Sequence, residues 1–223
     1  MQLRALMLAT ALAGMSVLPG SAQELADFDY ENLAFRGFGL EFGYLWPDKV
    51  EPTPTYGLRM DLGYLGPALR VAPALTYWSS RMKAAEVGEL EDRLERLIAR
   101  QQPGTLAPLV LGPIDWSDLT LALDAHVVWR VPYGFLTFAG AGASVHFLNV
   151  SGEAIAGTLV EDLLDAISAG FGLHAGVEYP LRRRVRLYAT GRLELLEDRR
   201  YGSVSGGVQI HFGSIVPGEE GSR

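Results

Sequence analysis

The stretch "GFGLEFGYLW", Gly37–Trp46, alternates large apolar residues with small or polar ones. One set of alternate places holds Phe38, Leu40, Phe42, Tyr44 and Trp46, and the other holds Gly37, Gly39, Glu41, Gly43 and Leu45. Successive side chains of a β-strand point to opposite faces of the sheet. A period of two residues therefore predicts a strand with one bulky apolar face and one face of small or polar side chains.

Seven further stretches repeat this alternation, and together they predict an antiparallel sheet of eight strands. The seven are Thr55–Gly66, Leu69–Trp78, Asp118–Val131, Phe138–Phe147, Gly170–Tyr179, Val185–Leu195 and Ser203–Phe212. Short turns are expected at Gly66–Pro67, Pro132–Gly134 and Pro180–Arg184, and longer loops at Pro47–Pro54, Lys83–Asp115, Leu148–Ser168 and Glu197–Tyr201. Tight turns at one end and long loops at the other are typical of an all-β, up-and-down barrel.

Two of the long loops carry a helical pattern. In Glu86–Gln101, apolar residues recur three or four places apart, and acidic and basic residues pair four places apart. In Thr158–Ile167, Thr158 and Glu161 form a capping box ahead of apolar residues. We expect both segments to form short helices that roof or flank the mouth of the barrel.

Residues 1–22 have the composition of a secretory signal peptide, with Arg4, an apolar run and then the small residues Gly20, Ser21 and Ala22. We expect residues 23–33 to lead into a barrel over 34–213, followed by a tail over 214–223. The chain has no cysteine, which excludes disulfides and thiol-based zinc sites. Its net charge of −7 disfavours a nucleic-acid partner, and no motif indicates a cofactor.

The two faces of the strands distinguish two kinds of barrel. A soluble ligand-binding barrel holds bulky apolar residues inside, whereas a membrane barrel has an apolar outer belt and a polar or small-residue lumen. Eight strands enclose little space, so the face of small residues is expected to point inward. Aromatic residues also gather near both strand ends, as membrane interfaces favour. Near the long loops they are Tyr44, Trp46, Tyr56, Tyr77, Trp116, Phe147 and Phe171, and near the short turns Tyr64, Trp129, Phe135, Tyr179 and Phe212.

In these features the chain resembles the small OmpA/OmpX-type outer-membrane β-barrels of Gram-negative-type bacteria. The resemblance spans residues 34–212 and is carried by Gly37–Trp46, Phe138–Phe147, Gly170–Tyr179 and Ser203–Phe212. It implies an eight-stranded transmembrane barrel with periplasmic short turns and extracellular loops. It also implies contact with outer-membrane lipid and insertion by the outer-membrane assembly machinery. Such barrels usually end on the aromatic residue of the last strand, whereas here a tail follows Phe212.

Charged and histidine side chains fall on the inward face of the predicted strands. By alternation they are Glu41, Arg59, Asp61, Arg70, Asp124, His126, Arg130, His146, His174, Glu178, Arg186, Arg192, Glu194 and His211. Buried charges persist only when they are paired and hydrogen-bonded, so this mixture predicts a salt-bridged network that plugs the lumen. Glu178 and Arg186 are expected to lie opposite each other across their turn, and Arg130→Ala is expected to destabilise the barrel. A narrow polar pore is the alternative.

Catalysis and metal binding are weaker interpretations of the same residues. Asp124 and His126 lie two residues apart on one strand face, as a site would require. However, all four histidines fall on the inward parity, where a lipid substrate cannot reach, they lie on four different strands, and no Ser-His pair is evident. We therefore expect neither an enzyme nor a metal site.

The sequence thus predicts an integral outer-membrane barrel with a structural, adhesive or interaction role, whose loops could meet an extracellular partner. A narrow porin-like channel for small solutes is the alternative function. A soluble periplasmic ligand-binding barrel is the third.

Overall fold

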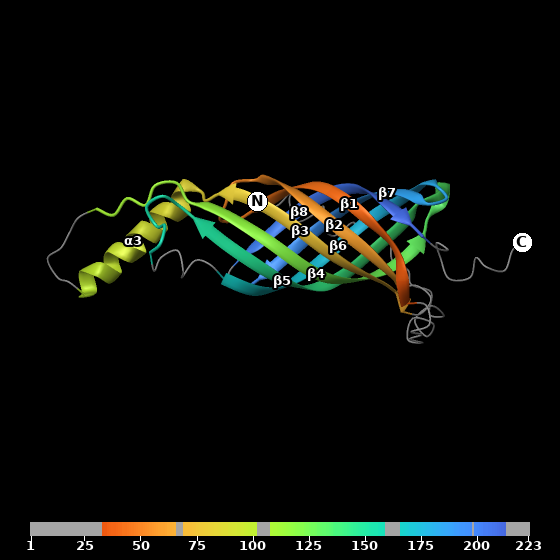
Figure 1. Cartoon of the computed structure of the whole chain (residues 1–223), viewed down its shortest axis with the longest axis horizontal. Coiled ribbons are helices and arrows are strands. Elements are labelled where there is room, and N and C mark those ends of the chain that lie inside the picture. The colour runs from red at the N-terminus through yellow and green to blue at the C-terminus, as the bar shows by residue number, and fades with distance from the viewer. Residues whose placement is uncertain (1–32, 66–68, 102–107, 159–165, 198, 213–223) are drawn as a thin grey trace, which may run out of the picture.

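The computed structural model describes residues 33–65, 69–101, 108–158, 166–197 and 199–212, which form a barrel with one helix at its end (Figure 1). The strands are β1 (Leu33–Pro47), β2 (Thr53–Leu65), β3 (Leu69–Arg81), β4 (Asp115–Arg130), β5 (Leu136–Ser151), β6 (Ala166–Arg182), β7 (Val185–Leu196) and β8 (Arg200–His211). The helix α3 spans Ala84–Gln101, and a 3-10 turn, η1, spans Pro132–Gly134.

Each strand pairs with the next in antiparallel register, and β1 pairs with β8 to close the sheet. At this seam the register runs without interruption from Gly37 opposite His211 to Pro47 opposite Tyr201. Closure leaves none of these eight strands with an unpaired edge. The predicted eight-stranded, antiparallel, up-and-down barrel is therefore confirmed.

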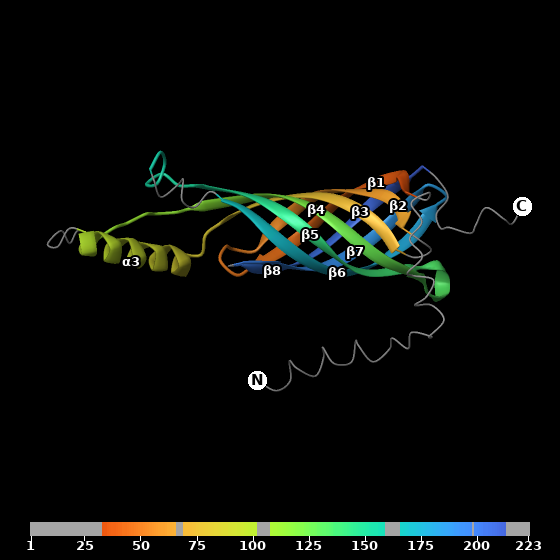
Figure 2. The same ribbon diagram turned by 90° about the horizontal axis from the view of Figure 1, so that it is seen from below.

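The two ends of the barrel differ, as predicted, in that long segments join β3 to β4 and β5 to β6 at one end only. The longer loop predicted at Glu197–Tyr201 was wrong, because β7 runs to Leu196 and β8 begins at Arg200, which leaves three residues between them. At the short-turn end, η1 joins β4 to β5 with Tyr133 in the left-handed region (φ 69°), and Arg183 and Arg184 turn β6 into β7. At the long-loop end, α3 projects beyond the rim, away from the strands (Figures 1 and 2). The helix begins two residues before its predicted start, at Ala84.

An apolar cluster gathers where α3 meets the barrel. Its buried members are Leu45, Val50, Trp78, Met82, Val87, Leu111, Ile114, Trp116, Leu148, Val150 and Ile155. The Glu91 and Glu95 carboxylates of α3 accept hydrogen bonds from the backbone N–H groups of Leu111 (2.7 Å) and Leu109 (2.8 Å). These contacts fasten the helix to the segment that leads into β4.

The outer surface of the barrel is apolar, and the interior is polar. Outside, Leu40 is 65% exposed and Leu123 is 56% exposed, whereas inside, Arg70 and Glu178 are completely buried. Away from the strand ends, no outward position of the described strands carries a charged side chain. This arrangement inverts that of a soluble barrel and matches that of a membrane barrel.

Ten of the twelve aromatic residues assigned to the two belts face outward, and two were assigned wrongly. Tyr64 is buried because the register of β2 shifts between Arg59 and Tyr64, where Gly63 adopts a positive φ of 84°. A β-bulge of this kind reverses the facing of the residues beyond it. Trp116 lies on the same inward parity as Asp118 and joins the apolar cluster.

In the described part of the chain, no helix combines the length and apolarity needed to cross a bilayer. The predicted signal peptide, most of the lead-in, the tail and the Gly66–Pro67 turn lie outside the described residues and stay predictions. Most of the predicted Thr158–Ile167 helix lies outside them too, but its last two residues, Ala166 and Ile167, belong to β6.

Candidate functional site

Three arginines converge on Glu178 in the half of the lumen nearer the short turns. Arg59 Nη2 donates to Glu178 Oε1 (2.6 Å), and Arg186 Nη1 donates to Oε2 (2.8 Å). Arg70 donates to both carboxylate oxygens, at 2.5 and 3.0 Å. We call these four residues, all at most 6% exposed, the Glu178 cluster. Hydrogen bonds between two ionised groups are about twice as strong as neutral ones, so this carboxylate holds strands β2, β3 and β7 to β6.

Aromatic rings and a second carboxylate surround the Glu178 cluster. The Arg59 guanidinium lies 4.9 Å from the centre of the Phe138 ring and 4.7 Å from that of Tyr188. Asp61 lies 4.0 Å from Arg70 Nη1. Three guanidiniums thus share two carboxylates, and the ring faces offset part of the excess positive charge.

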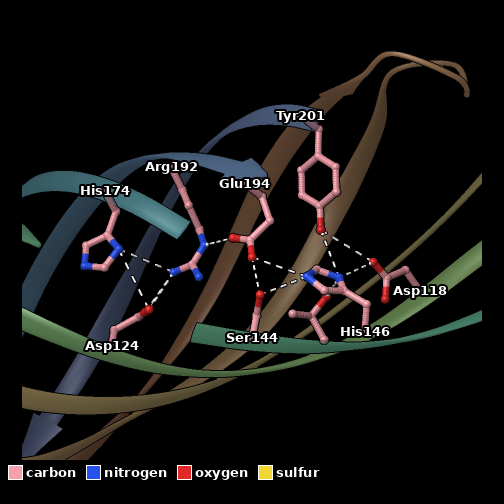
Figure 3. Close-up of polar contacts among 9 residues, drawn as sticks. Asp118, Asp124, Ser144, His146, His174, Arg192, Glu194 and Tyr201 are labelled. Atoms are coloured by element: carbon pink, nitrogen blue, oxygen red, sulfur yellow. Dashed lines mark hydrogen bonds and ion pairs between the residues drawn. The ribbon is translucent and has the colours of Figure 1, made fainter. Parts of the chain in front are cut away.

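A second cluster lies in the half of the lumen nearer the long loops (Figure 3). His146 Nδ1 lies 2.8 Å from Asp118 Oδ2, and His146 Nε2 lies 3.3 Å from Glu194 Oε1. The Ser144 hydroxyl donates to Glu194 Oε1 and lies 3.0 Å from His146 Nε2. The Tyr201 hydroxyl lies 3.2 Å from His146 Nδ1. In this His146 cluster, defined by these five residues, one imidazole is held between two carboxylates.

Arg192 links the His146 cluster to the middle of the lumen. Its Nε donates to Glu194 Oε2 (2.6 Å), and its Nη1 donates to both oxygens of Asp124 (2.9 and 2.8 Å). His174 Nδ1 lies 3.8 Å from Asp124 Oδ1 (Figure 3). The side chains of β4, β6 and β7 therefore meet across the lumen at this level.

Two imidazoles continue the network toward the Glu178 cluster. The His174 ring lies edge-on to the His126 ring, with 4.6 Å between centroids, and His126 Nδ1 lies 3.3 Å from Arg70 Nη2. On another wall, the Tyr188 hydroxyl donates to Glu41 Oε2 (3.2 Å). Polar and ring contacts thus run along the lumen from one cluster to the other.

Inward glycines leave the space that these side chains occupy. A Cβ atom on Gly142 would lie 2.0 Å from Asp124 Oδ1, and one on Gly172 would lie 2.3 Å from Arg192 Nη2. Real Cβ atoms essentially never approach a neighbour so closely, so a larger residue at either position would displace a side chain of the adjacent strand. The small-residue face predicted from the sequence is the wall against which the network packs.

A cavity of about 70 Å³ lies within the lumen, beside Arg192. Five residues that line it carry a buried atom with no hydrogen-bond partner among the described residues: Arg59 Nε, Trp78 Nε1, His174 Nε2, Thr190 Oγ1 and Arg192 Nη2. A space of this volume holds about five water molecules, and such polar atoms are the partners that buried water requires.

Asp118, His146 and Ser144 have the connectivity of a Ser-His-Asp triad, a pairing that the sequence did not reveal. In such a triad the serine hydroxyl gives its proton to the imidazole. Here the hydroxyl donates instead to Glu194, and Ser144 is only 4% exposed. The geometry therefore fits a structural network better than a nucleophile, and the absence of enzyme activity stays a prediction.

Asp124, His126 and His174 offer three ligand atoms within 4.8 Å of one another. However, Arg192 donates to both oxygens of Asp124, and Arg70 donates to His126 Nδ1. A cation bound there would lie against two guanidiniums, which would repel it. These three residues therefore do not fit a metal ion while the arginines hold them.

Thirteen of the fourteen side chains predicted to point inward are buried or half-buried within the barrel, and Arg130 is not. Arg130 is exposed because it is the last residue of β4, where the barrel wall ends. The predicted pairing of Glu178 with Arg186 was wrong in register. The strands place Glu178 opposite Tyr188 and Pro180 opposite Arg186, after a shift between Pro180 and Arg182. The two side chains nevertheless meet diagonally, at 2.8 Å.

Several residues of the network were not among the predicted site residues: Asp118, Ser144, Tyr188 and Tyr201. Each lies on the inward parity of its strand, so alternation alone could have included them. Ser144 resembles the small wall residues around it, and the tyrosines are as suited to a belt as to a lumen. Their contacts depend on how the closed barrel aligns distant strands.

Neither a protein-family model nor a curated protein matches the sequence. Solved structures do match the fold. Neisserial surface protein A is 16% identical, with 79% of this chain and 97% of that chain covered and a TM-score of 0.53. Ail, the attachment invasion locus protein of Yersinia pestis, is 11% identical over 81% and 99% of the two chains (TM-score 0.48). The N-terminal β-barrel domain of Pseudomonas aeruginosa OprF is 12% identical over 78% and 97% (TM-score 0.42).

At these identities a structural match establishes the fold and not the function. The likeness to Neisserial surface protein A covers nearly all of that protein. It agrees with the closed eight-stranded sheet described above. This chain has the fold of the small eight-stranded outer-membrane β-barrels of the OmpA/OmpX type.

Proposed function

We propose that this chain is an integral outer-membrane protein whose barrel is plugged by its own polar side chains and whose role is structural, adhesive or interaction-based. The observation that carries the proposal is the apolar exterior around a charged interior, from Leu40 and Leu123 outside to Arg70 and Glu178 inside. Soluble monomers rarely expose apolar patches larger than a few hundred Å². A ring of exposed leucine, valine and aromatic residues fits a lipid environment.

The orientation in the membrane follows from the two ends of the barrel. Trp46 and Tyr77 are exposed near the long loops, and Trp129 and Tyr179 are exposed near the short turns, as two interfacial belts require. The proposed protein is exported by its signal peptide and inserted by the outer-membrane assembly machinery. Its short turns then lie in the periplasm, and its long loops lie outside the cell.

The adhesive or interaction role is assigned to the long-loop end. There α3 extends past the rim and exposes both charged and apolar side chains, including Leu97 at 53%. The segment between α3 and β4 exposes Val110 at 75%. A helix that projects from a rigid barrel is a suitable element for contact with an extracellular partner.

Fractionation of cells tests the membrane assignment. The protein is expected in the outer-membrane fraction, released only by detergent. Leu123→Arg, at the middle of β4, should impair insertion by about 2 to 4 kcal/mol, whereas Ser117→Arg, on the same outward face near the long loops, should cost about 0 to 1 kcal/mol. Recovery in a detergent-free periplasmic wash would instead support the soluble ligand-binding barrel.

A narrow channel for small solutes is the second candidate, and the cavity beside Arg192 favours it. Single-channel recording in planar bilayers separates the two functions. A plugged barrel gives no steady openings, and Arg192→Ala should produce them only if the cavity connects both ends. Steady openings of the unmodified protein would contradict the plugged barrel and support the channel.

A further inference from the structure

The short-turn rim of the barrel carries charge of one sign. Its described charged residues are Arg36, Arg130, Arg182, Arg183 and Arg184, which we call the arginine rim. Arg36 is half-buried and the other four are exposed. No aspartate or glutamate is exposed or half-buried among the described residues of this rim, residues 33–36, 130–135, 180–185 and 212.

The charge beneath the rim has the same sign. In the Glu178 cluster, three guanidiniums share the carboxylates of Glu178 and Asp61. The half of the interior next to the rim therefore supplies no surplus carboxylate to neutralise it. Charges of one sign gathered at one end of a low-dielectric body raise the local potential and attract counter-ions.

Exposed aromatic residues place the arginine rim at the level of lipid headgroups. Trp129 directly precedes Arg130, and Tyr179 lies three residues before Arg182. The Phe135 and Tyr179 rings contact each other, with 5.0 Å between centroids. Because such rings settle at the membrane–water interface, the arginines next to them reach the phosphate layer.

The long-loop end lacks this uniformity. The helix α3 carries Glu86, Glu89, Glu91, Asp92 and Glu95 together with Arg93, Arg96 and Arg100. Some of these charges pair within the helix, as Arg93 and Glu89 do at 3.4 Å. The accumulation of arginine is therefore a property of one end of the barrel and not of its surface as a whole.

We propose that the arginine rim binds the phosphate groups of anionic phospholipids in the periplasmic leaflet, an inference that rests on the proposed insertion into the outer membrane. A guanidinium donates two parallel hydrogen bonds to phosphate oxygens, and arginine is more weakly hydrated than lysine. Three consecutive arginines, Arg182–Arg184, present such donors where β6 turns into β7, at the exposed edge of the barrel. Each basic residue near an anionic bilayer strengthens binding about fivefold.

The test titrates the folded full-length protein in detergent micelles with phosphatidylglycerol or with zwitterionic phosphatidylethanolamine, and counts bound lipid by native mass spectrometry. The protein should retain phosphatidylglycerol in preference to phosphatidylethanolamine, and high salt should weaken this binding. The triple variant R182Q/R183Q/R184Q should lower the affinity for phosphatidylglycerol by about tenfold to 100-fold. The matched control, R93Q/R96Q/R100Q on α3, removes as many charges and should leave the affinity unchanged.

The outcomes separate this inference from the membrane proposal. A protein that never folds into lipid vesicles, judged by its heat-dependent gel shift, would contradict the proposed function itself. A protein that folds into lipid vesicles but binds both lipids equally would overturn only the proposal that the arginine rim binds anionic phospholipid. The acidic lead-in is the competing occupant, with Glu24, Asp27, Asp29 and Glu31. If only the variant E24Q/D27N/D29N/E31Q binds phosphatidylglycerol, the rim is occupied by this segment and the lipid proposal is wrong.

Discussion

The Glu178 cluster and the His146 cluster bury charge in the same lumen with opposite balances. Around Glu178, three guanidiniums depend chiefly on one carboxylate. Around His146, two carboxylates and the hydroxyls of Thr120, Ser144 and Tyr201 share one imidazole, and Arg192 binds a further carboxylate nearby. The first cluster has one indispensable member, whereas the second has several that can substitute for one another.

Neutralising Glu178 should have the largest effect. Glu178→Gln leaves Arg59, Arg70 and Arg186 buried and facing one another, so we expect the free energy of unfolding to fall by about 3 to 5 kcal/mol. Urea unfolding in lipid vesicles measures this change. Glu89→Gln, in an exposed pair on α3, is the control and should change little.

Neutralising Glu194 should cost less and so sharpen the comparison. Glu194→Gln keeps an oxygen that accepts from Ser144, and Arg192 keeps its two bonds to Asp124. We expect a loss of about 1.5 to 3 kcal/mol by the same unfolding measurement. Equal losses for the Glu178 and Glu194 variants would contradict the distinction between the two clusters.

Crowding the Asp124–Arg192 pair, which links the two clusters, should lower the stability of the barrel by a smaller amount. Gly142→Ala would press Asp124 away from Arg192 and should destabilise the barrel by about 1 to 3 kcal/mol. The matched substitution is Gly191→Ala, where a Cβ atom meets nothing within 4 Å. If both alanines are tolerated equally, the close packing of Asp124 against the wall is wrong.

Removing Arg130 should have the smallest effect, contrary to the expectation from the sequence. Arg130 is exposed at the end of β4 and lies outside both clusters. We expect Arg130→Ala to change the free energy of unfolding by less than about 0.5 kcal/mol. If Arg130→Ala lowers the free energy of unfolding as much as Glu194→Gln does, Arg130 contributes to the buried network after all.

The fold was predictable because alternation is a local property of the chain. Each strand shows its two faces in its own sequence, and the small-residue face alone indicated which side points inward. The partners of the inward charges were not predictable, since Arg59 and Glu178 are 119 residues apart and meet only across a closed barrel. Their pairing depends on the stagger between strands, which no single strand encodes.

Local irregularities account for the remaining errors. Tyr64 faces inward because a bulge precedes it, and Gly63 is the only local sign of that bulge in a chain rich in glycine. The predicted register of Glu178 and Arg186 was wrong because β6 continues to Arg182, past Pro180, which was expected to start the turn. Both errors arise at strand ends near the short turns, where one residue more or less changes the facing.

The wide sequence separation of the lumen contacts bears on how the barrel is assembled. A sheet containing only β6 and β7 would supply Glu178 with Arg186 alone, because Arg59 and Arg70 belong to β2 and β3. Likewise, Glu41 of β1 meets Tyr188 of β7 only after the sheet has rolled up. A partly closed sheet would therefore leave these charged groups without their partners, and closure of the β1–β8 seam supplies them. We therefore expect the interior network to slow the opening of the finished barrel, because opening would leave buried charges unpaired.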